Sequence, residues 1–415
     1  MKSVVAFVSL ALLGCAAIWA QNLSSKASGK VSNRERPAIT QQATGAATNP
    51  VVSNEVRTAV EKGAKWLASV QGADGGWGQD GGATSNIRQT ERLESKGNDV
   101  ANTAVAALAL LRAGDQYRPN VERAVNFILK KVEISPTNGL SITDVNETQI
   151  QRKLGPFIDT FLASMLLAKV DGPLAGANKE RVRKGLEKCV AKIERNQSSD
   201  GSWNVAGGWA PVLGTSLASR GLYMASAKGV KVNEEVMARA DDYTVKSQQS
   251  VADGSRSGGG IGAGRGGGVG AGRGSATAVA SPSALGGIGR SEALGAAAGV
   301  DLYQSAQALE QLSRTPEARE KNASEIAVIT SKLSKAEFVE GYGSIGGEEF
   351  FSYLNINDSL KRTGGKEWGE WHSKITQKIL KVQNNDGTWA GHHCITGRVA
   401  VTSAAILNLI PDREN

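Results

Sequence analysis

The chain has 415 residues, of which 21% are charged and 40% are hydrophobic. This balance is typical of a folded protein with one large or two ordinary domains, and it excludes a disordered chain and a polytopic membrane protein. The formal net charge of +8 suggests a nucleic-acid partner, but most of it falls outside the region expected to fold. The leader carries +1, residues 21–53 carry +3 and residues 251–290 carry +3, which leaves about +1 for the rest. A nearly neutral folded region argues against nucleic-acid binding.

The first twenty residues predict an export signal. Lys2 precedes a short apolar run that ends in small residues near Ala20, which is the pattern of a secretory signal peptide. The run also contains Leu12-Leu13-Gly14-Cys15, similar to a bacterial lipoprotein box, but Leu13 is large for its position. We therefore favour cleavage near Ala20 over lipidation of Cys15. No later stretch reaches the ~18 apolar residues of a membrane span, so we expect a periplasmic or secreted protein.

Two segments are expected to lie outside the core of a single domain at residues 54–412. Residues 21–53 are rich in small and polar residues and predict a disordered linker. Residues 251–290 are rich in glycine, and their Gly-x-Gly-x-x-Gly matches follow no strand, so we interpret them as a flexible insert. Beyond the leader only Cys189 and Cys394 remain, which excludes a disulfide-rich scaffold. The two can pair, but separate roles are favoured because they lie in different kinds of segment.

The remaining chain alternates between two kinds of predicted helix. Amphipathic segments expected on the outside are 54–70, 119–131, 178–195, 233–247, 315–333 and 367–382. Segments rich in small and apolar residues, expected inside, are 99–112, 157–169, 211–227, 292–312, 347–360 and 396–410. Both sets follow the period of a helix, and no strand pattern is evident.

A short pattern recurs three times, each time after an outer segment. It consists of Gln, two residues, Asp-Gly, one residue and Trp, and Asp-Gly is typical of a tight turn that ends a helix. The copies are Gln71-Asp74-Gly75-Trp77, Gln197-Asp200-Gly201-Trp203 and Gln383-Asp386-Gly387-Trp389. The indole offers a large apolar face and an N–H, so Gln and Trp can clamp the turn.

This pattern resembles the QW-type repeat of the terpenoid cyclase and protein prenyltransferase superfamily, which includes the squalene and hopene cyclases. The resemblance covers most of residues 54–410. It implies that the Gln and Trp residues tie outer helices together and take no part in catalysis. With six alternating helix pairs, it predicts an all-α fold, a closed α6/α6 toroid with two concentric rings of helices.

The predicted connections are unequal. Links from inner to outer segments have about 2 to 8 residues, whereas links from outer to inner segments have about 13 to 44. All long links then emerge at the end of the toroid that carries the N-termini of the inner helices. Helix N-termini favour anions, so we expect this long-loop mouth to bind a ligand or protein partner, with a preference for anionic groups.

The strongest candidate for chemistry is the block His392-His393-Cys394, which precedes the last inner segment. A thiol at a helix N-terminus beside imidazoles can have a lowered pKa. The predicted catalytic residues are Cys394, His393 and Asp301, and the predicted zinc ligands are His392, His393 and Cys394. The alternative is a buried cysteine beside two loop-capping histidines, since adjacent side chains rarely point the same way.

Several polar residues fall in or beside the apolar inner segments. A charge there is costly unless it is paired or lines a cavity. The candidates for a ligand cavity are Asp99, Asp159, Arg220, Tyr303, Glu348, Tyr353 and Arg398. For the acids, helix capping or pairing with Arg220 or Arg398 is the favoured alternative.

The chain departs from the superfamily where its chemistry resides. Squalene-type cyclases protonate an alkene with an Asp-x-Asp-Asp run, and the nearest run here, Arg239-Ala240-Asp241-Asp242, lacks the first acid and falls on an outer helix. The aspartate-rich diphosphate pattern and the Asp-x-Cys zinc pair are absent from the sequence, and aromatic residues make up only 5%. We therefore favour an exported binding toroid. The alternative is an enzyme, either of isoprenoid cyclase or transferase type or dependent on Cys/His or zinc chemistry at Cys394.

Overall fold

The computed structural model describes residues 53–81, 97–203, 211–257, 301–335, 338–339, 346–392 and 395–411. All of them belong to one compact unit, residues 45–415. The secondary structure in these ranges is helical, with no β-strand. None of the helices described is long and apolar enough to cross a membrane.

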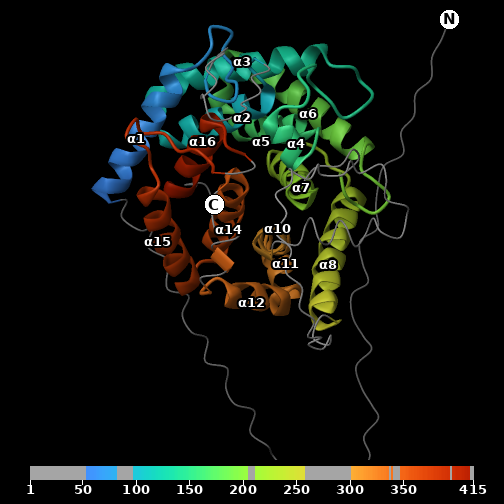
Figure 1. The fold of residues 1–415 in the computed structure, drawn as a ribbon. Helices are drawn as coiled ribbons and strands as arrows, with labels where there is room; N and C mark the ends of the chain where they lie inside the picture. The colour runs from blue at the N-terminus through green and yellow to red at the C-terminus, as the bar shows by residue number, and fades with distance from the viewer. Residues whose placement is uncertain are drawn as a thin grey trace, which may run out of the picture. The chain divides into compact units, whose positions relative to one another are not determined.

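An inner ring of helices closes on itself. Each inner helix packs against the next, and the last packs against the first (Figure 1). The ring consists of α2 (Val100–Ala113), α5 (Ile158–Val170), α7 (Pro211–Ala227), α10 (Asp301–Leu312), α14 (Gly347–Thr363) and α16 (Arg398–Leu409). These helices are rich in small and apolar residues, as expected for helices surrounded by protein on most sides.

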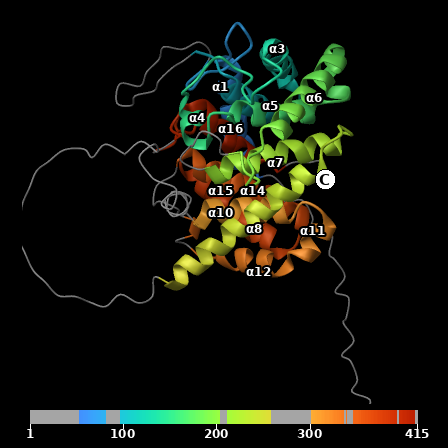
Figure 2. The same cartoon turned by 90° about the vertical axis from the view of Figure 1, so that its right-hand side faces the viewer.

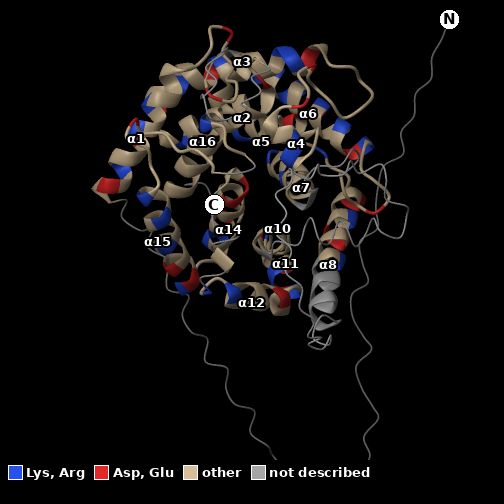
Figure 3. Ribbon diagram, viewed as in Figure 1, with Lys and Arg blue, Asp and Glu red and all other residues tan. Residues whose placement is uncertain are grey.

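A second set of helices surrounds this ring. Its members are α1 (Asn54–Ser69), α3 (Arg118–Ile134), α6 (Lys179–Arg195), α8 (Glu234–Ser257), α11 (Pro316–Lys321), α12 (Ala323–Lys332) and α15 (Lys366–Lys381). Figure 2 shows these helices from a second side. Each is amphipathic or charged, and charges of both signs are spread over the outer helices (Figure 3). Three short elements complete the described helices: η1 (Asp115–Tyr117), α4 (Gln149–Leu154) and η2 (Pro173–Asn178). The predicted α6/α6 toroid is confirmed.

Two predicted boundaries differ from the structure, and a third lies outside the described residues. The outer element at 315–333 is two helices, because Asn322 leaves the helical conformation (φ −109°, ψ 22°) and its side chain donates to the carbonyl of Ala318. Helix α8 continues to Ser257, so residues 251–257 are helical and not part of a glycine-rich insert. The described part of α10 begins at Asp301, and the predicted start at 292 lies outside the described residues.

The three repeat turns share one set of hydrogen bonds. In each, the Trp indole N–H donates to the carbonyl ten residues earlier in the outer helix, at 2.7–2.8 Å. The main-chain N–H of each Trp donates to a threonine hydroxyl in the next inner helix, and these threonines are Thr103, Thr215 and Thr402. Each turn is thus held to the helix before it and the helix after it.

The repeat glutamines join neighbouring outer helices. Gln71 donates to the carbonyl of Asn120 in α3 (2.9 Å), and Gln197 donates to that of Val236 in α8 (2.8 Å). Gln383 donates to the carbonyl of Ala59 in α1 (2.9 Å). The last turn therefore connects α15 to the first helix and closes the outer ring.

Candidate functional site

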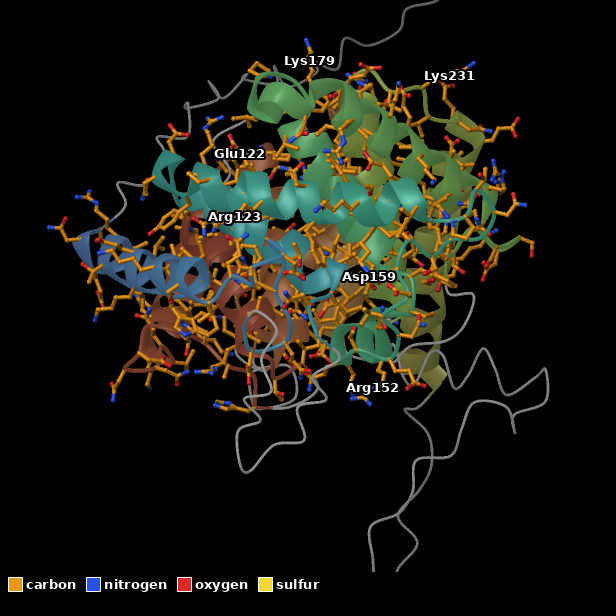
Figure 4. All side chains as sticks on the ribbon, turned by 90° about the horizontal axis from the view of Figure 1, so that it is seen from above. Glu122, Arg123, Arg152, Asp159, Lys179 and Lys231 are labelled. Carbon is orange, nitrogen blue, oxygen red and sulfur yellow. The ribbon has the colours of Figure 1, made fainter. Side chains whose placement is uncertain are left out.

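At the end of the ring where the inner helices begin, two buried carboxyl groups cap α2. Asp99 Oδ1 accepts from the main-chain N–H of Asn102 (2.7 Å), and Asp159 Oδ1 accepts from that of Ala101 (3.0 Å). Gln151 of α4 donates to the other oxygen of Asp159 (2.6 Å). Figure 4 shows Asp159 among the helices. Both groups satisfy N–H donors that the first turn of a helix leaves without a partner.

Burial changes the acidity of these two groups. Burial, with the charge of Asp159 as the second cause, raises the pKa of Asp99 to about 7. Burial also raises the pKa of Asp159 to about 6, against hydrogen bonds that lower it. A shift of this kind is frequent at functional sites, but these carboxyl oxygens are already engaged by the start of α2.

The N-terminus of α14 is also capped by buried side chains. Glu349 accepts from the main-chain N–H of Gly346 and from the hydroxyl of Tyr303, both at 2.8 Å. Glu348 accepts from the main-chain N–H of Ile395 (3.2 Å), and the hydroxyl of Tyr353 donates to the carbonyl of Val339 (2.6 Å). The three predicted cavity residues in this group, Tyr303, Glu348 and Tyr353, are buried. Their hydrogen bonds, with those of Glu349, link α14 to α10 and to the adjacent loops.

Helix α16 is also capped from within. The side chain of Gln149 accepts from the main-chain N–H groups of Thr396 (2.9 Å) and Gly397 (3.2 Å). Asp80 accepts from the main-chain N–H of Arg398 (2.9 Å), and the guanidinium of Arg398 lies over the ring of Trp66. Internal groups thus satisfy N–H donors at the starts of α2, α14 and α16. The predicted binding of a ligand or anion at this end of the ring stays a prediction.

The predicted Cys/His centre cannot be assembled from the described residues. His393 and Cys394 lie outside them, as does the side chain of Asp301, and His392 is exposed. Among the residues that are described, no group of three or more His, Cys, Asp or Glu side chains is arranged to hold a metal ion. Cys189 is a free, buried cysteine of α6, and burial raises the pKa of its thiol to about 12.

The lumen of the ring contains an apolar cavity of about 320 Å³. It extends from Val105 in the second turn of α2 to Gly114 beyond its last turn, a rise of about 13 Å. Its apolar lining comes from α2, α5, α7, α14 and α16 and includes Leu108, Leu162, Met165, Leu217, Phe351, Leu354 and Leu407. The cavity therefore reaches the end of the ring where the inner helices terminate.

A second cavity, of about 520 Å³, adjoins the lumen and shares Lys169, Arg220 and Met224 with it. It lies between the C-terminal parts of α5, α7, α10 and α14, and reaches exposed residues at Lys228. Six basic side chains line it: Lys169, Arg220, Lys228, Arg319, Lys361 and Arg362. Two acids, Glu310 and Asp358, reduce the net charge of the lining to +4. We call this the basic antechamber.

Both acids of the basic antechamber are engaged by arginines. Arg314 donates to Glu310 at 2.6 Å in an ion pair that is almost fully buried. Arg220 pairs with Asp358, and Arg112 approaches the other oxygen of Asp358 at 3.8 Å. Burial raises the pKa of Glu310, but the charge and hydrogen bonds of Arg314 outweigh it and bring the pKa below its ordinary value.

Of the seven residues predicted from the sequence to line a cavity, only Arg220 lines either of these two cavities. The other cations were missed because basic residues in the last turn of a helix are common, where they interact favourably with the helix dipole. A signal was present nonetheless. Arg112, Lys169 and Arg362 each place a cation in the last turn of an inner helix.

Two segments keep part of the Asp-x-Asp-Asp run of the squalene-type cyclases, and Arg239-Ala240-Asp241-Asp242 keeps its last two acids. Asp99-Val100-Ala101-Asn102 keeps the first acid of Asp-x-Asp-Asp at the start of an inner helix, with Ala101 and Asn102 in place of the other two. Asp241 instead accepts from Gln311 and joins α8 to α10.

Comparison with known proteins supports a terpenoid cyclase-like relationship. Residues 41–139 match the family model for the squalene-hopene cyclase C-terminal domain. The chain is 40% identical over 70 residues to a squalene–hopene cyclase of Bradyrhizobium diazoefficiens, and 38% identical over 69 residues to a probable squalene–hopene cyclase of Sinorhizobium fredii. Each match covers 17% of this chain and 10% of the cyclase. The aligned part is thus about a tenth of the length of these relatives.

Among solved structures, one similar chain is a variant of the type II terpene cyclase MstE from Scytonema in complex with geranylgeranyl dihydroxybenzoate. It has 13% sequence identity, a TM-score of 0.33, and coverage of 86% of this chain and 96% of the other. The toroid assignment rests on the packing of the described helices. This helix packing and the sequence matches together identify the chain as similar to the terpenoid cyclase superfamily.

Proposed function

We propose that this chain is an exported binding toroid that holds an elongated, largely apolar ligand in its lumen. The observation that carries this proposal is the cavity between the inner helices, whose lining is mostly leucine, methionine and phenylalanine, with Arg112, Asp115, Lys169, Arg220 and Asn355 as its polar groups. A preformed apolar cavity with few polar groups is the common form of a small-molecule site. The ligand enters at the end where the inner helices terminate, opposite the long-loop mouth expected from the link lengths.

A change that fills the lumen tests this proposal. We expect the protein to bind a neutral fluorescent hydrocarbon probe saturably, and Leu108→Trp to weaken that binding by about tenfold or more, since Leu108 lines the cavity. Ile134→Trp is the matched control, because Ile134 is exposed on α3. Probe binding that is absent from the unmodified protein, or unchanged in Leu108→Trp, would contradict the proposal.

The second candidate function is an enzyme of isoprenoid cyclase or transferase type. Its supporting observation is the raised pKa of Asp99, because an acid that protonates an alkene must hold a proton near neutral pH. Incubation with a linear polyprene, followed by mass spectrometry of the products, tests it. Cyclic product from the unmodified protein that is absent with a folded Asp99→Asn variant would favour the enzyme over the binding toroid.

The zinc alternative at Cys394 has a separate test. Metal analysis of the purified protein and of Cys394→Ser measures stoichiometric zinc directly. Zinc in the unmodified protein that is lost in the variant would support His392, His393 and Cys394 as ligands. Protein free of zinc would retire that alternative without affecting the lumen.

A further inference from the structure

The basic antechamber has more positive charge than its own acids balance. Glu310 and Asp358 are bound by Arg314 and Arg220, so the acids of the lining are already engaged. Within the described residues, the side chains of Lys228, Arg319 and Arg362 make no ion pair. The two arginines donate to neutral acceptors: Arg319 to the carbonyl of Ser313 (3.2 Å), and Arg362 to the main-chain carbonyl of Glu310 (3.2 Å).

Arg362 lines the antechamber without an ion-pair partner among the described residues. Its Nε is buried and lacks a hydrogen-bond partner among the described atoms, although the side chain lines the antechamber. Burial lowers the pKa of Arg362, and the charges of Arg220 and Arg314 add to that effect against Glu310 and Asp358. A buried polar atom without a partner costs free energy, and an oxyanion is the group that a guanidinium binds best.

The antechamber and the apolar lumen are continuous. They share Lys169, Arg220 and Met224, so a molecule with its chain in the lumen can place one end among the cations. An anion bound here also meets the C-terminal ends of the inner helices, whose dipoles disfavour negative charge. The net lining charge of +4 outweighs that effect, because each helix end contributes only about half a charge.

The geometry points to a ligand that is an amphipathic anion, with its hydrocarbon chain in the lumen and one carboxylate or phosphate head in the basic antechamber. Lys228, Arg319 and Arg362 bind the head, and the leucine-rich wall binds the chain. This inference rests on the proposed function, to which it adds the class of ligand and the direction in which it lies. Carboxylate and phosphate heads share the oxyanion chemistry that the three cations recognise.

Calorimetric titration with four probes tests the inference below the micelle concentration. Undecanoate, decyl phosphate and decanol share a ten-carbon chain and differ in the head, and inorganic phosphate represents the head alone. We expect at least one of the two anions to bind about tenfold or more tightly than decanol, and inorganic phosphate to bind more weakly than decyl phosphate. The preferred anion then identifies the head.

Variants at the rim provide the controls, because a change at half-buried Arg362, whose Nε is enclosed, can disturb the fold. The double variant Lys228→Gln, Arg319→Gln should bring binding of the anions close to that of decanol, with binding of decanol unchanged. Lys231→Gln is the matched control, since Lys231 is an exposed lysine three residues from Lys228 that lies at the periphery and does not line the cavity (Figure 4). It should change none of the four affinities.

Failure of this inference differs from failure of the proposed function. If decanol and both anions bind equally and Leu108→Trp weakens all three, the lumen binds chains and the anionic head is wrong. If inorganic phosphate binds as tightly as decyl phosphate, the site takes a free anion and the amphipathic ligand is wrong. If neither decanol nor the anions bind, the proposed function itself is contradicted.

Discussion

The ion pair of Arg314 and Glu310 is almost completely withdrawn from water. Their side chains are 3% and 1% exposed, and Arg314 also donates to Ser219 (2.7 Å). Two charges in this position stabilise each other only as a pair, because either one alone keeps its full desolvation cost. The pair lies directly behind the basic antechamber, so it fixes the wall against which a ligand head would rest.

Removal of one partner should therefore be costly. We expect Arg314→Met to lower the free energy of unfolding by about 3–5 kcal/mol, because it leaves the Glu310 carboxylate buried without its partner. Urea denaturation followed by circular dichroism measures the change. Arg319→Met is the control, with an expected loss of less than about 1 kcal/mol, since Arg319 is only half-buried. Equal losses in the two variants would contradict this account.

Asp99 gives the fold a dependence on pH. Its pKa is about 7 in the folded protein against about 3.9 in an unfolded chain, so the folded state holds the proton more strongly. The contribution of protonated Asp99 to the stability of the fold is complete below pH 4 and is lost as the pH rises through 7. Asparagine also caps helices and does not ionise.

We expect Asp99→Asn to become progressively more stable relative to the unmodified protein between pH 5 and 8. The difference should grow by at most about 1.4 kcal/mol per pH unit. Chemical denaturation at several pH values measures it. A difference that stays constant across this range would show that Asp99 titrates at its ordinary pKa.

At the scale of the element, the repeat turns depend on glycine. Gly201 has φ +90°, and a Cβ there would lie 2.1 Å from the carbonyl oxygen of Arg239 in α8. Gly75 is equally constrained, with 2.5 Å to the carbonyl oxygen of Arg123. The turn must therefore adopt a left-handed conformation and also allow the next outer helix to approach its backbone.

These two requirements can be separated by substitution. Gly229→Ala tests the conformation alone, because Gly229 has φ +75° and nothing within 4 Å of a new Cβ. We expect it to cost about 1 kcal/mol and Gly201→Ala to cost at least about 2 kcal/mol more, since the turn must move away from α8. Thermal unfolding of both variants measures the difference. Similar losses of stability in Gly229→Ala and Gly201→Ala would mean that the repeat turn at Gly201 can move away from α8 at little cost.

The helices and repeat turns could be predicted from the sequence because their signals are local. Apolar periodicity and Asp-Gly spacing reflect contacts within one helix or with its neighbour. The ends of the ring could not be predicted, because their character depends on distant segments. Gln149 reaches α16 across 247 residues of sequence, and Asp159 caps α2 across 58. A cation such as Arg362 looks like an ordinary helix end until the lumen beside it is known.

At the scale of the whole ring, the contact between α15 and α1 closes the outer ring, and we call it the seam. Its contribution to stability can be tested at Gln383. Gln383→Ala and Gln197→Ala each remove two donated hydrogen bonds of the same geometry, and Gln197→Ala also removes one accepted from Arg239 (3.0 Å). We expect similar losses of stability, about 1–3 kcal/mol each. Hydrogen exchange should differ, with faster exchange in α1 and α15 for Gln383→Ala and in α6 and α8 for Gln197→Ala. Faster exchange in α1 with both variants would indicate that the seam opens first regardless of the mutation.

The closed ring also has a topological consequence. Five of the six inner helices continue directly into an outer helix through a short link. The sixth, α16, ends near Ile410 at the same end of the ring where α1 begins at Asn54, and the two helices pack together. A short linker from Pro411 to Ser53 would make the sixth hairpin equivalent to the other five. New chain ends between Ser257 and Asp301 would then give a circular permutant with the same two rings of helices.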